Sequence, residues 1–270
     1  MMKVGIMLMS NCGPDGQPWD WIQHLMRCKE HGVQMVDLFE QMIRLDGLTI
    51  RTMRNILDDL GLQPSIYCVR TDFTSPDSRV RSESLDATKR GVEACHELGI
   101  NLLFNYGGQH GSKGEDAFAR FVDGLADAVD VAGEAGIILS IENAGTLCHT
   151  DTELLRCIKA VGKPNLKITF DGGNFILAGC NPHSAAELLA SEVVHVHVKS
   201  FMRVTDEAQQ LSPDKPFKYC PVGQGLVDYR KIRAILTTAG FDGCMSFEPE
   251  GGHDSRWYES LDALTQIVKG

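Results

Sequence analysis

The sequence predicts an α/β protein that folds as a single (β/α)8 TIM barrel over residues 1–270. Short apolar or β-branched runs alternate with longer amphipathic stretches along the chain, a pattern typical of βα units and a parallel sheet. The alternation repeats eight times without interruption. A doubly wound sheet of this length would more often change direction or carry a second domain, so a closed barrel is favoured.

The expected strands are short, apolar and bounded by turn signals, as in strands buried on both faces. They lie at residues 4–9, 35–39, 65–69, 102–106, 137–142, 167–170, 193–198 and 245–248. The order predicts a parallel barrel in which the carboxyl ends of all strands meet at one rim, where barrel enzymes carry their chemistry.

The expected helices lie between and after the strands, at residues 19–31, 50–60, 82–98, 116–135, 152–161, 184–189, 228–239 and 255–268. Six of them are followed by a glycine, which is the preferred left-handed residue after a helix: Gly32, Gly61, Gly99, Gly136, Gly162 and Gly240. Residues 201–225 form the one long irregular connection, and a connection of this length is usually functional.

The amino-acid composition limits the kinds of molecule that the chain is expected to bind. The chain has 36 acidic and 26 basic residues, a net charge of −10 that opposes binding to a nucleic-acid backbone. No apolar run approaches the roughly 20 residues of a membrane span. Nine cysteines without a CxxC pair, and an N-terminus without a signal-peptide pattern, indicate a reduced, cytoplasmic protein. We therefore expect a small-molecule substrate; an oligomer is possible, but the sequence carries no interface signal.

The fifth to eighth expected strands end in side chains that bind metals: Glu142, Asp171, His197 and Glu248. Carboxylates converging at one rim are costly to bury unless a cation neutralises them. Three carboxylates and one imidazole suit one divalent ion, with manganese preferred and magnesium, cobalt or zinc also admissible. The alternative is that each acid caps the next helix or pairs with a surface base.

Strand alternation places His195, His197 and Lys199 on one face. His195 then lies deeper than His197, as a hydrogen-bonded core histidine. Lys199 is a candidate to bind a substrate oxygen, a carboxylate or a phosphate, and its alternative partner is Glu250. Other substrate-binding candidates near the strand ends are Asn105, His110 and Asn143.

Four motifs resemble the sugar isomerase and epimerase family with a xylose isomerase-like barrel, which includes ketose 3-epimerases, hydroxypyruvate isomerase, inosose dehydratase and 3-dehydroshikimate dehydratase. The resemblance covers the whole chain. It implies that Glu142, Asp171, His197 and Glu248 hold the metal, and that Arg203 contacts the substrate and a metal-bound glutamate. The motifs are Ile141-Glu142-Asn143, Phe170-Asp171-Gly172-Gly173-Asn174, His195-Val196-His197-Val198-Lys199 and Gly223-Gln224-Gly225-Leu226-Val227-Asp228.

The resemblance implies an isomerase or epimerase of a small sugar, keto-sugar or related polyhydroxy compound. Glu142 and Glu248 are the expected catalytic residues, which transfer a proton through an enediolate whose charge the divalent ion stabilises. Asn174, a further candidate substrate contact, and Cys148 occupy positions where ketose 3-epimerases carry histidine and glutamate. This departure leaves open a dehydratase or lyase of the inosose or 3-dehydroshikimate type. A third alternative is a barrel that binds a metabolite without turning it over.

Endonuclease IV, a DNA-repair enzyme with the same barrel, is disfavoured. It requires additional histidines after the third, sixth and seventh strands, and Asn174 occupies one of those positions. The acidic composition also argues against a DNA substrate.

Overall fold

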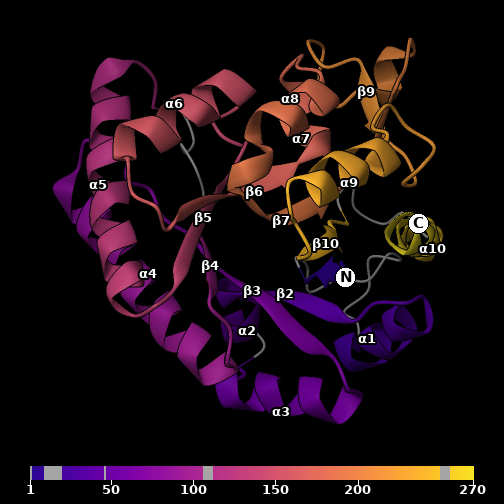
Figure 1. Cartoon of the computed structure of the whole chain (residues 1–270), viewed down its shortest axis with the longest axis horizontal. Coiled ribbons are helices and arrows are strands. Elements are labelled where there is room, and N and C mark those ends of the chain that lie inside the picture. Colours follow the sequence, from indigo (N-terminus) through magenta and orange to yellow (C-terminus); the bar gives the residue numbers. More distant parts are fainter. Residues whose placement is uncertain (1, 9–19, 46, 106–111, 250–255) are drawn as a thin grey trace.

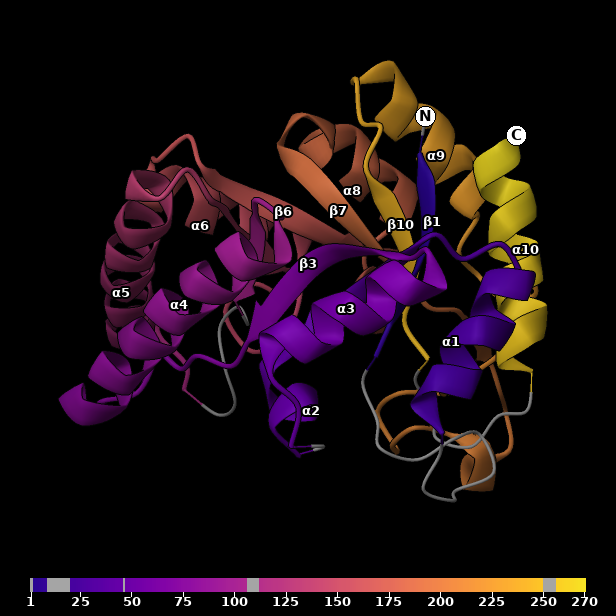
Figure 2. The same ribbon diagram turned by 90° about the horizontal axis from the view of Figure 1, so that it is seen from below.

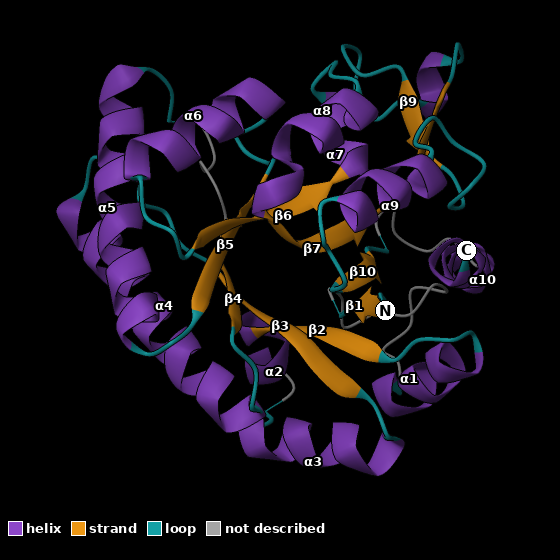
Figure 3. Ribbon diagram, in the orientation of Figure 1, coloured by secondary structure: helices purple, strands orange, loops and turns teal. Residues whose placement is uncertain are grey.

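Eight parallel strands close into a barrel with helices packed around its outside, which confirms the predicted fold class (Figures 1 and 3). The computed structural model describes residues 2–8, 20–45, 47–105, 112–249 and 256–270. The strand order around the barrel is β1-β10-β7-β6-β5-β4-β3-β2. These strands are β1 Lys3–Met7, β2 Met35–Phe39, β3 Gln63–Val69, β4 Leu102–Asn105, β5 Ile138–Glu142, β6 Leu166–Asp171, β7 Val193–Val198 and β10 Cys244–Phe247.

The helices are α1 Trp21–Glu30, α2 Glu40–Leu45, α3 Ile50–Leu60, α4 Ser78–Leu98, α5 Glu115–Glu134, α6 Asp151–Val161, α7 Gly172–Leu177, α8 Pro182–Leu189, α9 Tyr229–Thr238 and α10 Trp257–Lys269, with the 3-10 turns η1 Ala190–Glu192 and η2 Glu207–Gln209. The short helices α2 and α7 were not predicted, because each starts directly at the end of a strand. The six predicted helix-end glycines all have positive φ, between 63° and 93°. None of the described helices combines the length and apolarity needed to cross a membrane.

The strands are buried on both faces, and the two faces differ in chemistry. Outward side chains such as Val36, Leu139 and Val196 pack against the helices in the main hydrophobic core. Inward side chains of β3 and β4, including Ile66 and Phe104, form a small apolar cluster inside the barrel. The inward side chains of β5, β6 and β7 are largely polar and buried, so one half of the barrel interior is a polar environment.

The segment 201–225 is not wholly irregular, which corrects the sequence-based prediction. It contains an antiparallel hairpin of β8 Phe201–Arg203 and β9 Phe217–Tyr219. The rings of Phe201 and Tyr219 lie 4.6 Å apart and hold the two strands together. Figure 2 places this segment at the same end of the barrel as α2, which is the end where the strands terminate.

The start of α6 provides a test of local stability. The Thr150 hydroxyl accepts a hydrogen bond from Glu153 N at 3.2 Å, and the Glu153 carboxylate accepts one from Thr150 N at 2.9 Å. We expect Thr150→Ala to lower the free energy of unfolding by about 1 kcal/mol, because it removes one half of this capping box. Urea denaturation measures the loss.

The matched control is Thr238→Ala on the exposed end of α9, which we expect to change stability by less than about 0.5 kcal/mol. Equal losses in the two variants would contradict a specific capping contribution.

Candidate metal centre

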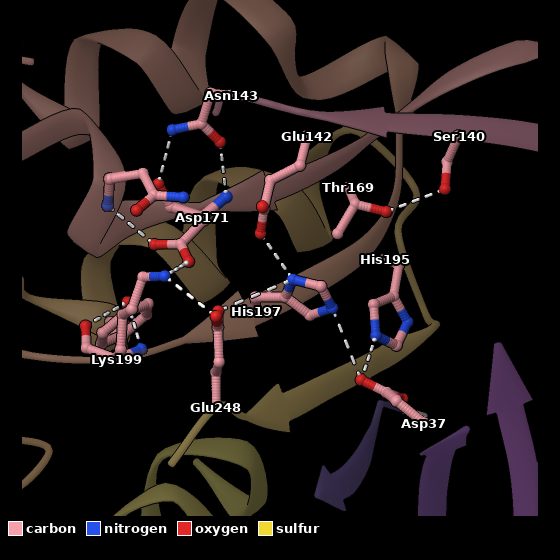
Figure 4. Close-up of polar contacts among 12 residues, drawn as sticks. Asp37, Ser140, Glu142, Asn143, Thr169, Asp171, His195, His197, Lys199 and Glu248 are labelled. Atoms are coloured by element: carbon pink, nitrogen blue, oxygen red, sulfur yellow. Dashed lines mark hydrogen bonds and ion pairs between the residues drawn. The ribbon is translucent and has the colours of Figure 1, made fainter. Parts of the chain in front are cut away.

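The structure brings together the four side chains that end β5, β6, β7 and β10 (Figure 4). Glu142 and Asp171 are the last residues of β5 and β6, His197 lies on β7, and Glu248 directly follows β10. One nitrogen or oxygen from each lies within 4.8 Å of the others. All four side chains are buried, so their charges are poorly screened by water.

Two cationic groups lie among the carboxylates. His197 Nδ1 is 2.6 Å from Glu142 Oε1 and 3.8 Å from Glu248 Oε2. Lys199 Nζ is 3.0 Å from Glu248 Oε1 and 3.1 Å from Asp171 Oδ2. Lys199 thus shares the inward face with His197, as predicted, and its amine is an immediate neighbour of two candidate ligands.

The pKa shifts reflect this crowding of charge. Burial lowers the pKa of His197, but the charge of Glu142, the nearby Asp37 carboxylate and the hydrogen bond with Glu142 outweigh burial and raise it well above its ordinary value. Burial also raises the pKa of Asp171, and repulsion from Glu142 adds to the rise despite the attraction of Lys199. The negative charge of the carboxylates therefore exceeds the positive charge of His197 and Lys199. This set of donors fits a divalent cation.

Asp171 is held in place by its neighbours in the chain. Its Oδ1 accepts a hydrogen bond from Asn174 N at 2.8 Å and so caps α7. Asn143 donates from Nδ2 to Asp171 O and accepts at Oδ1 from Asp171 N, both at 2.8 Å. Asn143 thus uses both ends of its amide to position Asp171, and its suggested contact with substrate stays a prediction. No described contact of the Asn174 side chain tests its suggested role.

The two glycines after Asp171 allow the chain to pass close to Lys199. A Cβ at Gly173 would lie 2.6 Å from Lys199 Cγ, and one at Gly172 would lie 3.1 Å from the Tyr229 hydroxyl. That hydroxyl donates to Lys199 O at 2.8 Å and accepts from Lys199 N at 3.1 Å. Tyr229 and the paired glycines therefore fix the backbone from which the Lys199 amine reaches the carboxylates.

The structure describes two of the three other suggested substrate contacts. Arg203 is exposed on the β8–β9 hairpin, with its guanidinium carbon 5.2 Å from the centre of the Phe217 ring. None of the described contacts of Arg203 is with Glu142, so its suggested contact with a metal-bound glutamate stays a prediction. Asn105 donates to Thr88 Oγ1 of α4 at 3.0 Å and so faces the helix layer. His110 lies outside the described residues.

Sequence reasoning missed Asp37, which lies in the middle of β2 and is fully buried. Its Oδ2 is 3.0 Å from His195 Nε2, which confirms His195 as a hydrogen-bonded core histidine. Burial raises the pKa of Asp37, but the charge and hydrogen bond of His195, together with the nearby His197, outweigh burial and lower it well below its usual value. A single carboxylate within the apolar run Met-Val-Asp-Leu-Phe is the signal that identifies it in the sequence.

The family profile described as "Xylose isomerase-like TIM barrel" matches residues 25–267. The chain belongs to this family. It is 24% identical over 268 residues to L-ribulose-5-phosphate 3-epimerase UlaE of Shigella flexneri serotype 5b (strain 8401), a match that covers 92% of this chain and 87% of that protein.

Two solved structures share the xylose isomerase-like barrel. The probable 3-DHS dehydratase AsbF of Bacillus anthracis matches with a TM-score of 0.77 at 16% identity, over 100% of this chain and 99% of that one. An L-ribulose 3-epimerase matches with a TM-score of 0.72 at 17% identity, over 100% of this chain and 92% of that one. At these identities the two matches support the fold alone.

The buried ligand set predicts that divalent metal stabilises the folded chain. We expect MnCl2 at one hundred times its Kd to stabilise the wild type by about 2.7 kcal/mol, measured as a rise in Tm. His197→Ala should abolish the rise, because it removes the imidazole ligand and leaves three crowded carboxylates.

The control is His96→Ala on the exposed surface of α4, which should keep the full response. A response of the same size in His197→Ala, or none in the wild type, would argue against this site.

Proposed function

We propose that the chain is an enzyme of the sugar isomerase and epimerase type, and that it moves a proton on a small sugar, keto-sugar or related polyhydroxy compound with the help of one divalent metal ion. The observation that carries the proposal is the convergence of Glu142, Asp171, His197 and Glu248 at the strand ends of a xylose isomerase-like barrel. The similarity to L-ribulose-5-phosphate 3-epimerase supports the same type of reaction.

In this proposal Glu142, Asp171, His197 and Glu248 hold the metal. Three carboxylates and one imidazole suit a hard or borderline cation, of which we favour Mn²⁺, with Mg²⁺, Co²⁺ or Zn²⁺ as alternatives. When bound, the ion supplies Lewis acidity that polarises a substrate carbonyl and stabilises the negative charge left by proton removal.

Glu142 and Glu248 are the proposed proton-transfer residues. They come from β5 and β10, the outer two of four consecutive barrel strands, so they approach the centre of the cluster from different directions. One carboxylate removes the proton from the carbon beside the carbonyl, and the other returns a proton. Return to the opposite face of the same carbon gives epimerisation, whereas return to the neighbouring carbon gives isomerisation.

Lys199 assists Glu248 in this scheme. Its amine lies 3.0 Å from Glu248 Oε1 and is buried with it. This charge-assisted contact holds the Glu248 carboxylate in one position at the cluster. The same amine is a hydrogen-bond donor for a substrate oxygen at the cluster.

The second candidate function is a dehydratase, and the state of Cys148 favours it. Cys148 replaces a glutamate of the ketose 3-epimerases and is completely buried. A hydrogen bond with Cys157 and burial raise the pKa of its thiol well above the usual value, so the thiol stays neutral and cannot replace a carboxylate. In a dehydratase, the substrate loses a proton and then a hydroxyl group, and no proton returns to the carbon. The product has therefore lost one water molecule.

The experiment is a screen of keto-pentoses, keto-hexoses and their phosphates in D2O with MnCl2, followed by mass spectrometry and NMR. An epimerase or isomerase incorporates one deuterium and leaves the carbon skeleton unchanged. We expect Glu142→Gln and Glu248→Gln to lower kcat by about 10²–10⁴-fold, because each removes a proton-transfer group.

Glu187→Gln on the exposed side of α8 is the matched control and should keep full activity. A product that has lost one water molecule would identify the chain as a dehydratase and not as an isomerase or epimerase. Unaltered turnover in both Glu142→Gln and Glu248→Gln would refute the proposed mechanism.

A further inference from the structure

We infer that Asp37 and His195 are positioning residues that orient His197, so that its Nδ1 faces the candidate metal site and its Nε2 faces away. This inference rests on the proposed function, since it concerns how one of the four ligands is held. It assigns a role to a buried carboxylate and a buried imidazole that the proposed proton transfer does not use.

The contact spans the interior of the barrel. Asp37 lies on β2 and both histidines lie on β7, while β1 and β10 separate these two strands in the sheet. Asp37 Oδ2 is 3.0 Å from His195 Nε2 and 3.5 Å from His197 Nε2. The three side chains are at most 1% exposed, so water does not compete for these contacts.

Asp37 is itself fixed by an irregularity in the neighbouring strand. Val36 pairs with Pro64 and Leu38 pairs with Tyr67, so β3 has one residue more than β2 across this step. Such a bulge can redirect a side chain. At this bulge the Ser65 hydroxyl donates a hydrogen bond to Asp37 Oδ1. Asp37 therefore has one oxygen held by Ser65 and the other directed at the histidines.

The orientation of His197 follows from the groups at its two nitrogens. Nδ1 lies 2.6 Å from Glu142 Oε1, inside the candidate ligand set. Nε2 faces Asp37, which accepts but does not donate hydrogen bonds when ionised. With a metal in place of the Glu142 contact at Nδ1, the single ring proton of His197 would lie on Nε2, 3.5 Å from Asp37 Oδ2. His195 packs edge-on against the His197 ring, with ring centres 5.2 Å apart, and restricts its rotation.

The competing explanation is a second metal ion. Asp37, His195 and His197 also place one potential ligand atom each within 4.8 Å of the others. The 3.0 Å contact between Asp37 and His195 and the hydrogen bond from Ser65 are typical of a hydrogen-bonded group instead. The number of metal ions bound per chain separates the two explanations.

The test is calorimetric titration of the full, chelator-treated chain with MnCl2. We expect one equivalent to bind to the wild type, and we expect Asp37→Asn to raise the Kd about 10–100-fold, the usual cost of losing such an outer partner. Ser140→Ala is the matched control. Its hydroxyl pairs with Thr169 Oγ1 at 2.9 Å in the same polar interior, and its described contacts involve neither histidine. This variant should keep the wild-type Kd while losing some stability.

Nitrogen NMR of the wild-type chain loaded with Mg²⁺ gives a second measurement that does not depend on how Asp37→Asn folds. We expect His197 to carry its proton on Nε2. A proton on Nδ1, or an unchanged Kd in folded Asp37→Asn, would overturn the role of Asp37 and leave the proposed function standing. If the wild type binds two equivalents of metal and Asp37→Asn binds one, Asp37 is a ligand of a second metal ion and not a positioning residue. No metal binding by the wild type would overturn both the inference and the proposed function.

Discussion

Compensation of buried negative charge is the constraint on which the rest of this structure depends. Asp37, Glu142, Asp171 and Glu248 lie inside one barrel, almost completely shielded from water. Each buried carboxylate costs several kcal/mol in lost hydration unless other groups replace it. Lys199 and the β7 histidines supply part of the compensation, and backbone or hydroxyl donors supply more. A divalent cation at the four-residue cluster would complete it.

The fold concentrates these groups by giving the two halves of the barrel different interiors. On the β3 and β4 side, residues such as Ile66 and Phe104 fill the space with apolar atoms. On the β5, β6, β7 and β10 side, inward positions carry acids, histidines and hydroxyls. The apolar half lowers the local dielectric constant, which strengthens the interactions in the polar half. A rigid, poorly solvated set of charges is suited to stabilising negative charge on a substrate.

Positioning contacts account for much of the polar network around the candidate ligands. Asn143 holds the backbone of Asp171, and Tyr229 holds the backbone of Lys199. Asp37 performs the corresponding task for His197 in our inference. These residues lie on β2, β5 and α9 or beside them, so several parts of the chain contribute to the geometry of one site. Such outer contacts commonly set how tightly and how specifically a metal is held.

The sequence by itself determined the alternation of strands and helices, the helix-end glycines and the candidate ligands at four strand ends, because these depend on local periodicity and on the parallel order of βα units. Only the tertiary structure decided that Asn143 holds Asp171, that Arg203 lies over Phe217 on a hairpin and that Asp37 reaches His195 across the barrel. The last contact joins residues 158 positions apart. Its geometry depends on barrel closure and on a bulge in β3, neither of which local sequence patterns specify.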